Sequence, residues 1–279
     1  GTVTKSEFAR KTPVFAFASG PTNSMRGAAF LSGIENAMVV DIGGTTSDVG
    51  CIRNGYPREA NNVIEIGGVR TLFRMPDVVS IGIGGGTIVK SDPLEIGPES
   101  VGNRLHQAAR VFGGDQLTLT DIAVASGKLD LGEAGLVTEL SEQKISDIIN
   151  AVNKALENTV DSMKTDSAAT PLLVVGGGAM LCPREMEGIS EVVNVMHADV
   201  ANAVGAAMAQ ISGEVDRVFH NMSRDDLLLE AKKIATQRAV SAGAKESTVR
   251  VVDVEDLPLA YMPGNAVRAR VRVVGDIVD

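Results

Sequence analysis

Short apolar runs and longer stretches of helical spacing follow one another along the chain. The apolar runs predict strands, and they lie at 12–19, 37–41, 49–53, 63–66, 77–81, 172–175, 249–254 and 266–274. Apolar positions three and four residues apart predict helices at 25–31, 141–161, 200–212 and 225–242, and a capping signal starts a further helical stretch at 118–124. This interleaving predicts an α/β fold built on a mixed sheet.

The order of these elements also predicts local pairings and a division of the chain. The strands at 37–41 and 49–53 are expected to form a hairpin, with Asn54 and Gly55 in the turn that follows it. Thr22 or Asn23 can cap the first helix. We expect one main α/β domain at 1–215 and a small α+β extension, of one helix and two strands, at 216–279.

Composition narrows the classes of partner. The net charge of −9 argues against nucleic acid as a partner, although a small anion can still be held by a metal ion and backbone amides. The two cysteines, Cys51 and Cys182, are far apart and form no CxxC pair, so a disulfide scaffold or zinc site is not expected. No apolar run reaches the roughly 18 residues of a membrane span, and the first residues have no signal-peptide pattern. We therefore expect a cytoplasmic protein.

Three glycine loops follow predicted strands. They are Gly43–Gly44, Gly84–Gly86 and Gly176–Gly178. Glycine lets the backbone approach a ligand closely, and successive amides in such a turn can point into one concavity and bind phosphate. The three loops are therefore candidate cofactor-binding segments.

The stretch DIGGTTSDVG, residues 41–50, carries the chemistry that these loops require. Gly43 and Gly44 offer amides to phosphate oxygens, and Thr45 and Thr46 add hydroxyl donors. Asp41, at the end of a buried strand, needs a compensating charge, which a hydrated Mg²⁺ beside the phosphates would supply. Asp48 is a second candidate for the metal shell and, with Asp41, for a catalytic role, and a turn-forming role for Asp48 stays open. The alternative is a glycine hairpin capped by Thr and Asp.

This stretch resembles the phosphate loop of the actin, sugar-kinase and Hsp70 ATPase superfamily. By that resemblance two similar halves clasp ATP, the fold is ribonuclease H-like, and residues 1–215 form one half. LLVVGGGAM, residues 172–180, resembles the loop that holds the adenosine. GPTNSMRGAAFLSG and ANAVGAAMA resemble the two hinge helices, in which Gly205, Ala206 and Ala207 would allow close packing.

A more specific resemblance lies between residues 80 and 121. SIGIGGGTIV, LEIGPESVG and GGDQLTLTD resemble segments of the hydantoinase A / 5-oxoprolinase family, and the likeness covers roughly residues 19–212. The resemblance implies ATP- and Mg²⁺-dependent hydrolysis of a cyclic amide or imide, with ATP phosphorylating the substrate carbonyl oxygen. The chain has no obvious Ser-His-Asp or Cys-His constellation, which fits such chemistry.

One departure from the family concerns the substrate pocket. After GPESVG the family usually continues with Pro-Gly-Pro, a Cys and a Tyr, whereas this chain reads NRLHQAAR. The substrate is therefore left unassigned between hydantoin, oxoproline and related rings. His106 is a candidate acid or base or a surface histidine, and Glu99 can touch substrate or order its loop. His197, His220 and Asp121 are expected in capping or exposed positions.

One phosphate loop is present where the superfamily uses two. We expect the 279 residues to be the second half of a longer polypeptide, or a separately encoded subunit, that binds ATP weakly on its own. The missing N-terminal ATPase half or a partner subunit would complete the clasp, and exposed apolar surface would favour a homo- or hetero-oligomer.

Three other functions remain open. The first is the ATPase subunit of a ketone carboxylase of the same family, which uses the same phosphoryl chemistry. The second is a non-catalytic nucleotide-binding module, favoured by NRLHQAAR and disfavoured by the intact DIGGTTSDVG. A dinucleotide-binding oxidoreductase is the least favoured, because IGIGGGTIV leads into a strand rather than a helix.

Overall fold

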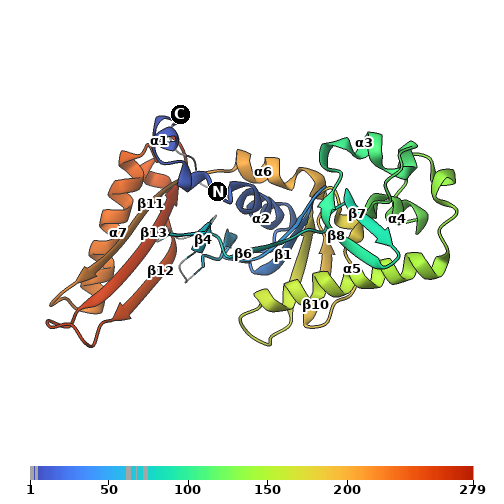
Figure 1. The fold of residues 1–279 in the computed structure, drawn as a ribbon. Helices are drawn as coiled ribbons and strands as arrows, with labels where there is room; N and C mark the ends of the chain where they lie inside the picture. The colour runs from blue at the N-terminus through green and yellow to red at the C-terminus, as the bar shows by residue number, and fades with distance from the viewer. Residues whose placement is uncertain (1–2, 4–5, 61–63, 67, 72–74, 279) are drawn as a thin grey trace. The chain divides into compact units, whose positions relative to one another are not determined.

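The chain folds into two compact units. The computed structural model describes residues 3, 6–60, 64–66, 68–71 and 75–278 (Figure 1). The larger unit is Ala18–Ala207, and the smaller unit combines Gly1–Phe17 with Met208–Asp279.

A mixed sheet forms the centre of the larger unit. Its strands are β1 (Ala37–Ile42), β2 (Ser47–Arg53), β3 (Tyr56–Pro57), β6 (Val78–Ile81), β9 (Thr170–Val175) and β10 (Ile189–Asn194). The strand order is β10-β9-β1-β2-β3, and β6 also pairs with β2. β1, β9 and β10 run parallel, whereas β1 and β2 form the predicted antiparallel hairpin. The predicted mixed sheet is therefore confirmed.

Helices cover both faces of this sheet. α5 (Glu142–Met163) packs against Met38, Val40, Leu172 and Val174, whereas α2 (Ser19–Ser32) packs against Val39, Leu173 and Val175. Successive side chains of a strand point to opposite faces, so buried strands between two helical layers are apolar throughout. This explains the continuous runs MVV and LLVV. The layers around β1 can be followed in Figure 1.

Shorter elements complete the larger unit. They are β4 (Ile64–Ile66), β5 (Val69–Thr71), β7 (Thr87–Ser91), β8 (Leu94–Ser100), α3 (Leu105–Ala108), α4 (Leu119–Ala125) and α6 (Ala201–Ala207). The hairpin of β7 and β8 follows the second glycine loop, as the sequence predicted for its first strand.

The smaller unit is a three-stranded antiparallel sheet with a helix on one face. Its elements are α1 (Ser6–Lys11), β11 (Ile211–Phe219), α7 (Arg224–Ser241), β12 (Arg250–Pro258) and β13 (Val267–Gly275), with the strand order β11-β13-β12. α7 buries Leu227, Ala231, Ala235 and Ala239 against the sheet. A Cβ on Gly213 would lie 2.1 Å from the Ala235 carbonyl oxygen, so glycine allows this close approach.

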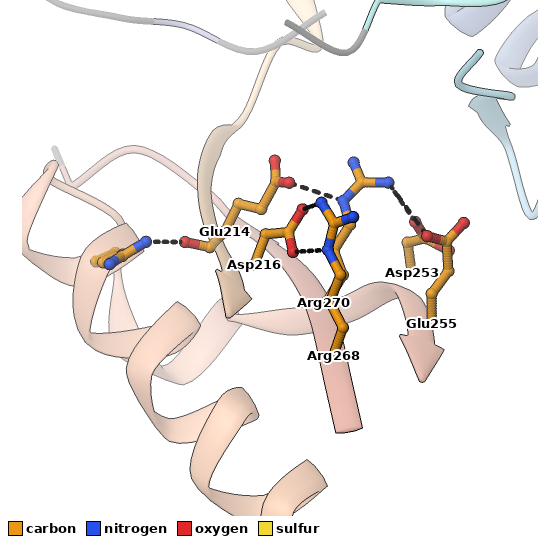
Figure 2. A network of polar contacts seen from close by, with 7 residues as sticks. Glu214, Asp216, Asp253, Glu255, Arg268 and Arg270 are labelled. Carbon is orange, nitrogen blue, oxygen red and sulfur yellow. Dashed lines mark hydrogen bonds and ion pairs between the residues drawn. The ribbon is translucent and has the colours of Figure 1, made fainter. Parts of the chain in front are cut away.

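The opposite face of that sheet is charged (Figure 2). Arg268 and Arg270 alternate along β13 with residues that pack under α7, so they point away from the helix. Arg268 pairs with Asp216 at 2.7 Å. The side chain of Arg270 is 3% exposed and lies 2.7 Å from Glu214 Oε1, with Asp253 and Glu255 at 3.6 and 3.8 Å. Ion pairs across the strands therefore compensate the charge of this buried arginine.

Two predicted elements were wrong, and one lies partly outside the described residues. Residues 12–19 form no strand: Pro13–Ala16 is a 3₁₀ helix and α2 begins at Ser19 after Ala18, not at Thr22 or Asn23. The helix predicted at 200–212 ends at Ala207, because the alternation of buried residues from Ile211 onward forms β11. In the strand predicted at 63–66, Val63 is not among the described residues. The expected boundary at residue 215 falls inside β11.

Candidate functional site

The three glycine loops meet at the end of β1. The turn 43–46 connects β1 to β2, and the amides of Gly85 and Gly86 donate to the carbonyl oxygens of Gly43 and Gly44 at 3.0 and 2.7 Å. From the other side, the Gly178 amide donates to the Ile42 carbonyl oxygen at 2.7 Å. Backbone hydrogen bonds therefore hold two loops, whose bonded residues are 42 and 136 positions further along the chain, around one turn.

Close backbone contacts explain why glycine occupies these positions. Gly176 has φ +91°, and a Cβ there would lie 2.3 Å from Asp41 Oδ1 and 2.4 Å from the Ile42 carbonyl oxygen. A Cβ on Gly84 would lie 2.7 Å from the Thr45 amide nitrogen. Any side chain at either position would separate the loops, so the glycines keep the Gly176 turn against Asp41.

The second loop braces the turn with its own amides. Gly84 donates to Thr87 Oγ1 at 2.8 Å, and the amides of Gly85 and Gly86 are bonded to the first loop. Thr120 adds a bond from its hydroxyl to the Gly85 carbonyl oxygen at 2.8 Å. Because these three amides already have protein acceptors, direct binding of a ligand by Gly84–Gly86 stays a prediction, and bracing is the role that their contacts support.

Other hydrogen-bond donors around the turn are available to a ligand. In the described part of the chain, the amides of Gly44, Thr45 and Gly177 and the hydroxyls of Thr45 and Thr46 have no protein acceptor. We call these groups the free-donor cluster. All four residues are exposed, and a Cβ on Gly44 or Gly177 would meet nothing within 4 Å. The turn is therefore open to a ligand rather than filled by side chains.

Two carboxylates flank the cluster. Asp41 and Asp48 are direct partners across β1 and β2, so their side chains share one face of the sheet. Ser80, from β6, donates a hydrogen bond to Asp48 Oδ1. Burial raises the pKa of Asp48 above its ordinary value, the Ser80 bond opposes this, and the charge of Asp41 raises it further. The two carboxylates therefore repel each other, and a cation between them would remove that cost.

The raised pKa of Asp48 predicts a pH-dependent effect of its replacement. Protonated Asp48 stabilises the fold at low pH, and this contribution is lost as pH rises from near 3.8 through the raised pKa. Asp48→Asn stays neutral and can still accept from Ser80. We expect its melting temperature relative to wild type to increase between about pH 4 and pH 7, measured by thermal unfolding without divalent ions. Asp130→Asn is the exposed control, and an offset independent of pH would contradict the prediction.

The carboxylate pair is also the place where a metal would fit. Within the described residues, no three His, Cys, Asp or Glu side chains cluster as a complete metal site. Mg²⁺ does not require such a cluster, because it is usually held by one or two carboxylates, water and phosphate oxygens. Asp41 and Asp48, beside the free-donor cluster, provide the carboxylate part of this set.

Helices α2 and α6 cross beside the sheet, and each helix has a glycine at the crossing. A Cβ on Gly27 of α2 would lie 1.8 Å from the Ala201 carbonyl oxygen, and one on Gly205 of α6 would lie 1.8 Å from the Asn23 carbonyl oxygen. Asn202 fixes the crossing with hydrogen bonds from Nδ2 to the Gly20 carbonyl oxygen and Ser24 Oγ at 2.9 and 3.1 Å. The close packing predicted for Gly205 is therefore present.

Comparison with known proteins assigns the amino-terminal part of the chain. The model of the Hydantoinase/oxoprolinase family matches residues 1–135. The match covers 135 of the 279 residues, slightly less than half of the chain. The matched range includes the Gly43 turn, Asp41, Asp48 and the second glycine loop.

Relatives of known function match part of the chain. The gamma subunit of acetophenone carboxylase from Aromatoleum aromaticum is 31% identical over 128 residues, which are 43% of this chain and 18% of that protein. The alpha subunit of caprolactamase from Pseudomonas jessenii is 30% identical over 126 residues, again 43% of this chain and 18% of that protein. The matched segment thus spans less than a fifth of the length of either relative.

A solved structure matches over most of the chain. The nucleotide-free structure of acetone carboxylase, from a study of ATP-dependent acetone carboxylation, aligns with a TM-score of 0.64 at 18% identity, over 93% of this chain and 49% of that chain. The chain therefore shares the fold of that structure, and its mixed sheet flanked by helices is the α/β arrangement that the sequence predicted. No helix among the described residues is long and apolar enough to cross a membrane.

Three further candidates from the sequence, Glu99, His106 and Asp121, lie outside the three loops. His106 is exposed on α3, with its ring 4.6 Å from the Phe112 ring. Glu99 is exposed on β8. Asp121 is fully buried and forms the predicted capping box with Thr118, and its Oδ1 also accepts from the Val111 amide at 2.7 Å. Asp121 is therefore a structural residue, as expected.

The other two histidines, His197 and His220, are both exposed. His197 is exposed in the left-handed region at φ 60° and makes no side-chain cap. His220 is exposed near the Pro263 carbonyl oxygen, 3.4 Å from Nδ1. Neither arrangement indicates catalysis.

Sequence reasoning missed residues that organise the site. Ser80 was read only as a strand residue, although it bonds Asp48. Thr87 is fully buried, and its hydroxyl accepts from the Gly84 amide and donates to the Gly82 carbonyl oxygen at 3.2 Å. A threonine directly after three glycines was an available signal for such a turn-closing bond.

Proposed function

We propose that this chain binds the phosphates of ATP at the free-donor cluster and forms the ATP-using part of an enzyme that opens a cyclic amide or imide. The observation that carries the proposal is the open set of amides and hydroxyls at Gly44, Thr45, Thr46 and Gly177, beside two carboxylates. Grouped backbone amides bind phosphate because their N–H dipoles converge on one anion.

In the proposed reaction the chain acts by positioning. The amides of Gly44 and Thr45 bind phosphate oxygens, and the Gly176–Gly178 turn lies on the adenosine side. Mg²⁺, when bound, neutralises charge on the phosphates. Asp41 and Asp48 would hold that ion. Transfer of the terminal phosphoryl group to the amide carbonyl oxygen, with release of ADP, makes the carbonyl carbon open to attack by water.

A ketone carboxylase subunit is the second candidate function. The similarity to a carboxylase gamma subunit from Aromatoleum aromaticum favours this second function. The similarity to the caprolactamase alpha subunit favours hydrolysis of a cyclic amide. Both names describe subunits, which supports a partner subunit that completes the site. Nucleotide-dependent turnover of lactams and imides, compared with ketones plus bicarbonate, separates the two candidates once that partner is added.

Replacing Asp41 by asparagine tests the nucleotide site directly. The wild-type chain is expected to bind ATP weakly, more tightly with Mg²⁺ than with EDTA, because the metal joins the carboxylates to the phosphates. Asp41→Asn should lose this Mg²⁺-dependent gain, by about tenfold or more in Kd if about 1.4 kcal/mol is removed. Isothermal titration calorimetry with ATP measures both values.

The matched control makes the same change of charge at an exposed position outside the proposed site. Asp130→Asn removes an exposed carboxylate of the same unit and should bind ATP as wild type does. A wild-type chain without Mg²⁺-dependent ATP binding would refute the proposed function, and an unchanged Asp41→Asn would remove Asp41 from the metal shell.

A further inference from the structure

A second groove lies at the opposite end of the central sheet from the glycine loops. It encloses about 180 Å³ and is lined by Asn36, Ala37, Met38, Cys51, Ile52, Arg53, Arg58, Lys164, Thr165, Asp166 and Thr170. These residues belong to the first positions of β1 and β9, the last positions of β2, and the segments beside them. We call it the basal groove.

The basal groove is separate from the proposed nucleotide site. Ala37 and Met38 begin β1 and line the groove, whereas Asp41 and Ile42 end the same strand beside the phosphate loop. A strand rises about 3.3 Å per residue, so roughly 10 Å of strand lie between Met38 and Asp41. An occupant of the groove would therefore not touch the free-donor cluster.

Three cationic side chains line the groove, and two of them lack a carboxylate partner among the described residues. Arg53 Nη2 donates to Thr165 Oγ1 at 3.2 Å, and Lys164 Nζ donates to the Gly188 carbonyl oxygen at 2.7 Å. Both acceptors are neutral, so the two positive charges remain uncompensated by these contacts. The groove's carboxylate, Asp166, accepts from the Ala168 amide at 3.0 Å, and the balance of charge in the lining is positive.

Arg58 is the rigid member of this group. Its Nε and Nη2 donate to Asp77 Oδ2 at 3.0 and 2.7 Å, and Nη2 also donates to the Met163 carbonyl oxygen at 2.9 Å. Its Nη1 is buried and has no acceptor among the described residues. The guanidinium is thus held rigidly beside the groove, where its charge adds to those of Arg53 and Lys164.

The size of the groove limits its occupant. A water molecule takes about 30 Å³ in the liquid, so the groove has room for about six waters or one small ion. Arginine binds carboxylate and phosphate oxygens in a planar fork, and lysine adds a compact charge. A chain with a net charge of −9 has no general attraction for anions, so a local excess of cations is a specific feature.

We propose that the basal groove binds a small oxyanion, a phosphate or a dicarboxylate, through Arg53, Arg58 and Lys164. The site is independent of the proposed ATP site, because the two have no lining residue in common.

Cys51 provides a local reporter for this binding. Its thiol is half-buried and lines the groove, whereas burial raises the pKa of the other cysteine, Cys182, to about 12, which makes it unreactive. Uncharged iodoacetamide should therefore modify Cys51 selectively. A ligand at twice its Kd should slow this modification about threefold, because the open fraction is 1/(1 + [L]/Kd).

The experiment compares inorganic phosphate and succinate with sodium chloride at equal ionic strength, and mass spectrometry follows the modification of Cys51. We expect phosphate or succinate, but not chloride, to protect Cys51, and the better protector identifies the head group. Protection should disappear in Arg53→Gln/Lys164→Gln, which leaves the Arg58–Asp77 pair intact. Lys144→Gln, on α5 and outside the groove, is the control and should keep it.

Titration calorimetry with the same probes gives a second measurement if Cys51 reacts too slowly. A loss of the binding heat in Arg53→Gln/Lys164→Gln supports the groove, even if the phosphate loops bind phosphate too. Equal protection by chloride, or binding heat that is unchanged in the double variant, would overturn the proposal. Neither result depends on whether ATP binds at the free-donor cluster.

Discussion

Replacing Gly27 by alanine is expected to destabilise the 18–207 unit severely. The new Cβ would lie 1.8 Å from the Ala201 carbonyl oxygen and 2.7 Å from its carbonyl carbon. Both atoms belong to the backbone, so no side chain can rotate away, and α2 and α6 must separate. Overpacking of this kind costs about 3 kcal/mol. We expect the melting temperature to fall by about 6–12 °C, at 2–4 °C per kcal/mol for a unit of this size.

Gly20→Ala is the matched control in the same helix. The nearest atom to a Cβ at Gly20 is Asn202 Nδ2 at 3.9 Å, which is ordinary van der Waals contact. Alanine also favours a helix over glycine. Thermal and urea unfolding should therefore show no loss of stability for Gly20→Ala. A Gly27→Ala protein as stable as this control would contradict the described crossing of α2 and α6.

Replacing Gly176 by alanine is expected to disrupt both the third loop and nucleotide binding. Alanine disfavours the left-handed backbone at φ +91°, at a cost of about 1–2 kcal/mol. Its Cβ would also lie 2.3 Å from Asp41 Oδ1, so the carboxylate or the loop must move. Because Asp41 is the proposed metal ligand, we expect at least a tenfold loss in Mg²⁺–ATP affinity, equal to about 1.4 kcal/mol.

Gly177→Ala is the matched control, because it also replaces a glycine of the third loop but introduces no close contact. A Cβ at Gly177 would meet nothing within 4 Å, and the backbone there is not left-handed, so this variant should unfold at the wild-type temperature. Calorimetric titration with Mg²⁺–ATP and thermal unfolding of both variants make the test. Wild-type unfolding and wild-type affinity in Gly176→Ala would show that the turn does not constrain Asp41.

Much of the larger unit could be predicted because its elements carry strong local signals. The continuous apolar runs of β1 and β9 need two covering layers, and α5 shows clear helical spacing from Ile145 to Leu156. The start of α2 was missed because its first turn, SGPT, carries no capping contact from Thr22 or Asn23, and the helix begins after Ala18 in the left-handed region. β11 was missed because the alanine-rich segment before it extended the predicted helix past its end.

The candidate site likewise contains some residues that a local pattern predicts and others that only the fold brings together. DIGGTTSDVG indicated a phosphate loop because glycines, threonines and aspartates at that spacing have few other uses. The role of Gly84–Gly86 depends on which carbonyl oxygens the fold brings to their amides, and no local pattern encodes that. Ser80 bonds Asp48 only because β6 pairs with β2, a tertiary arrangement. The phosphate-binding role of DIGGTTSDVG stays a prediction, whereas the contacts of Ser80 and Gly84–Gly86 depend on segments that are distant in sequence and could not be predicted locally.

The smaller unit is built from both ends of the chain, and this has a consequence for folding order. The amide of Val3 donates to the Gln210 carbonyl oxygen at 2.9 Å, and the three strands of this unit all follow residue 210. During synthesis, residues 18–207 can leave the ribosome and collapse while the early segment still lacks its sheet. The larger unit is thus free to fold first, and Val3 can reach its partner Gln210 only after that unit has been synthesised.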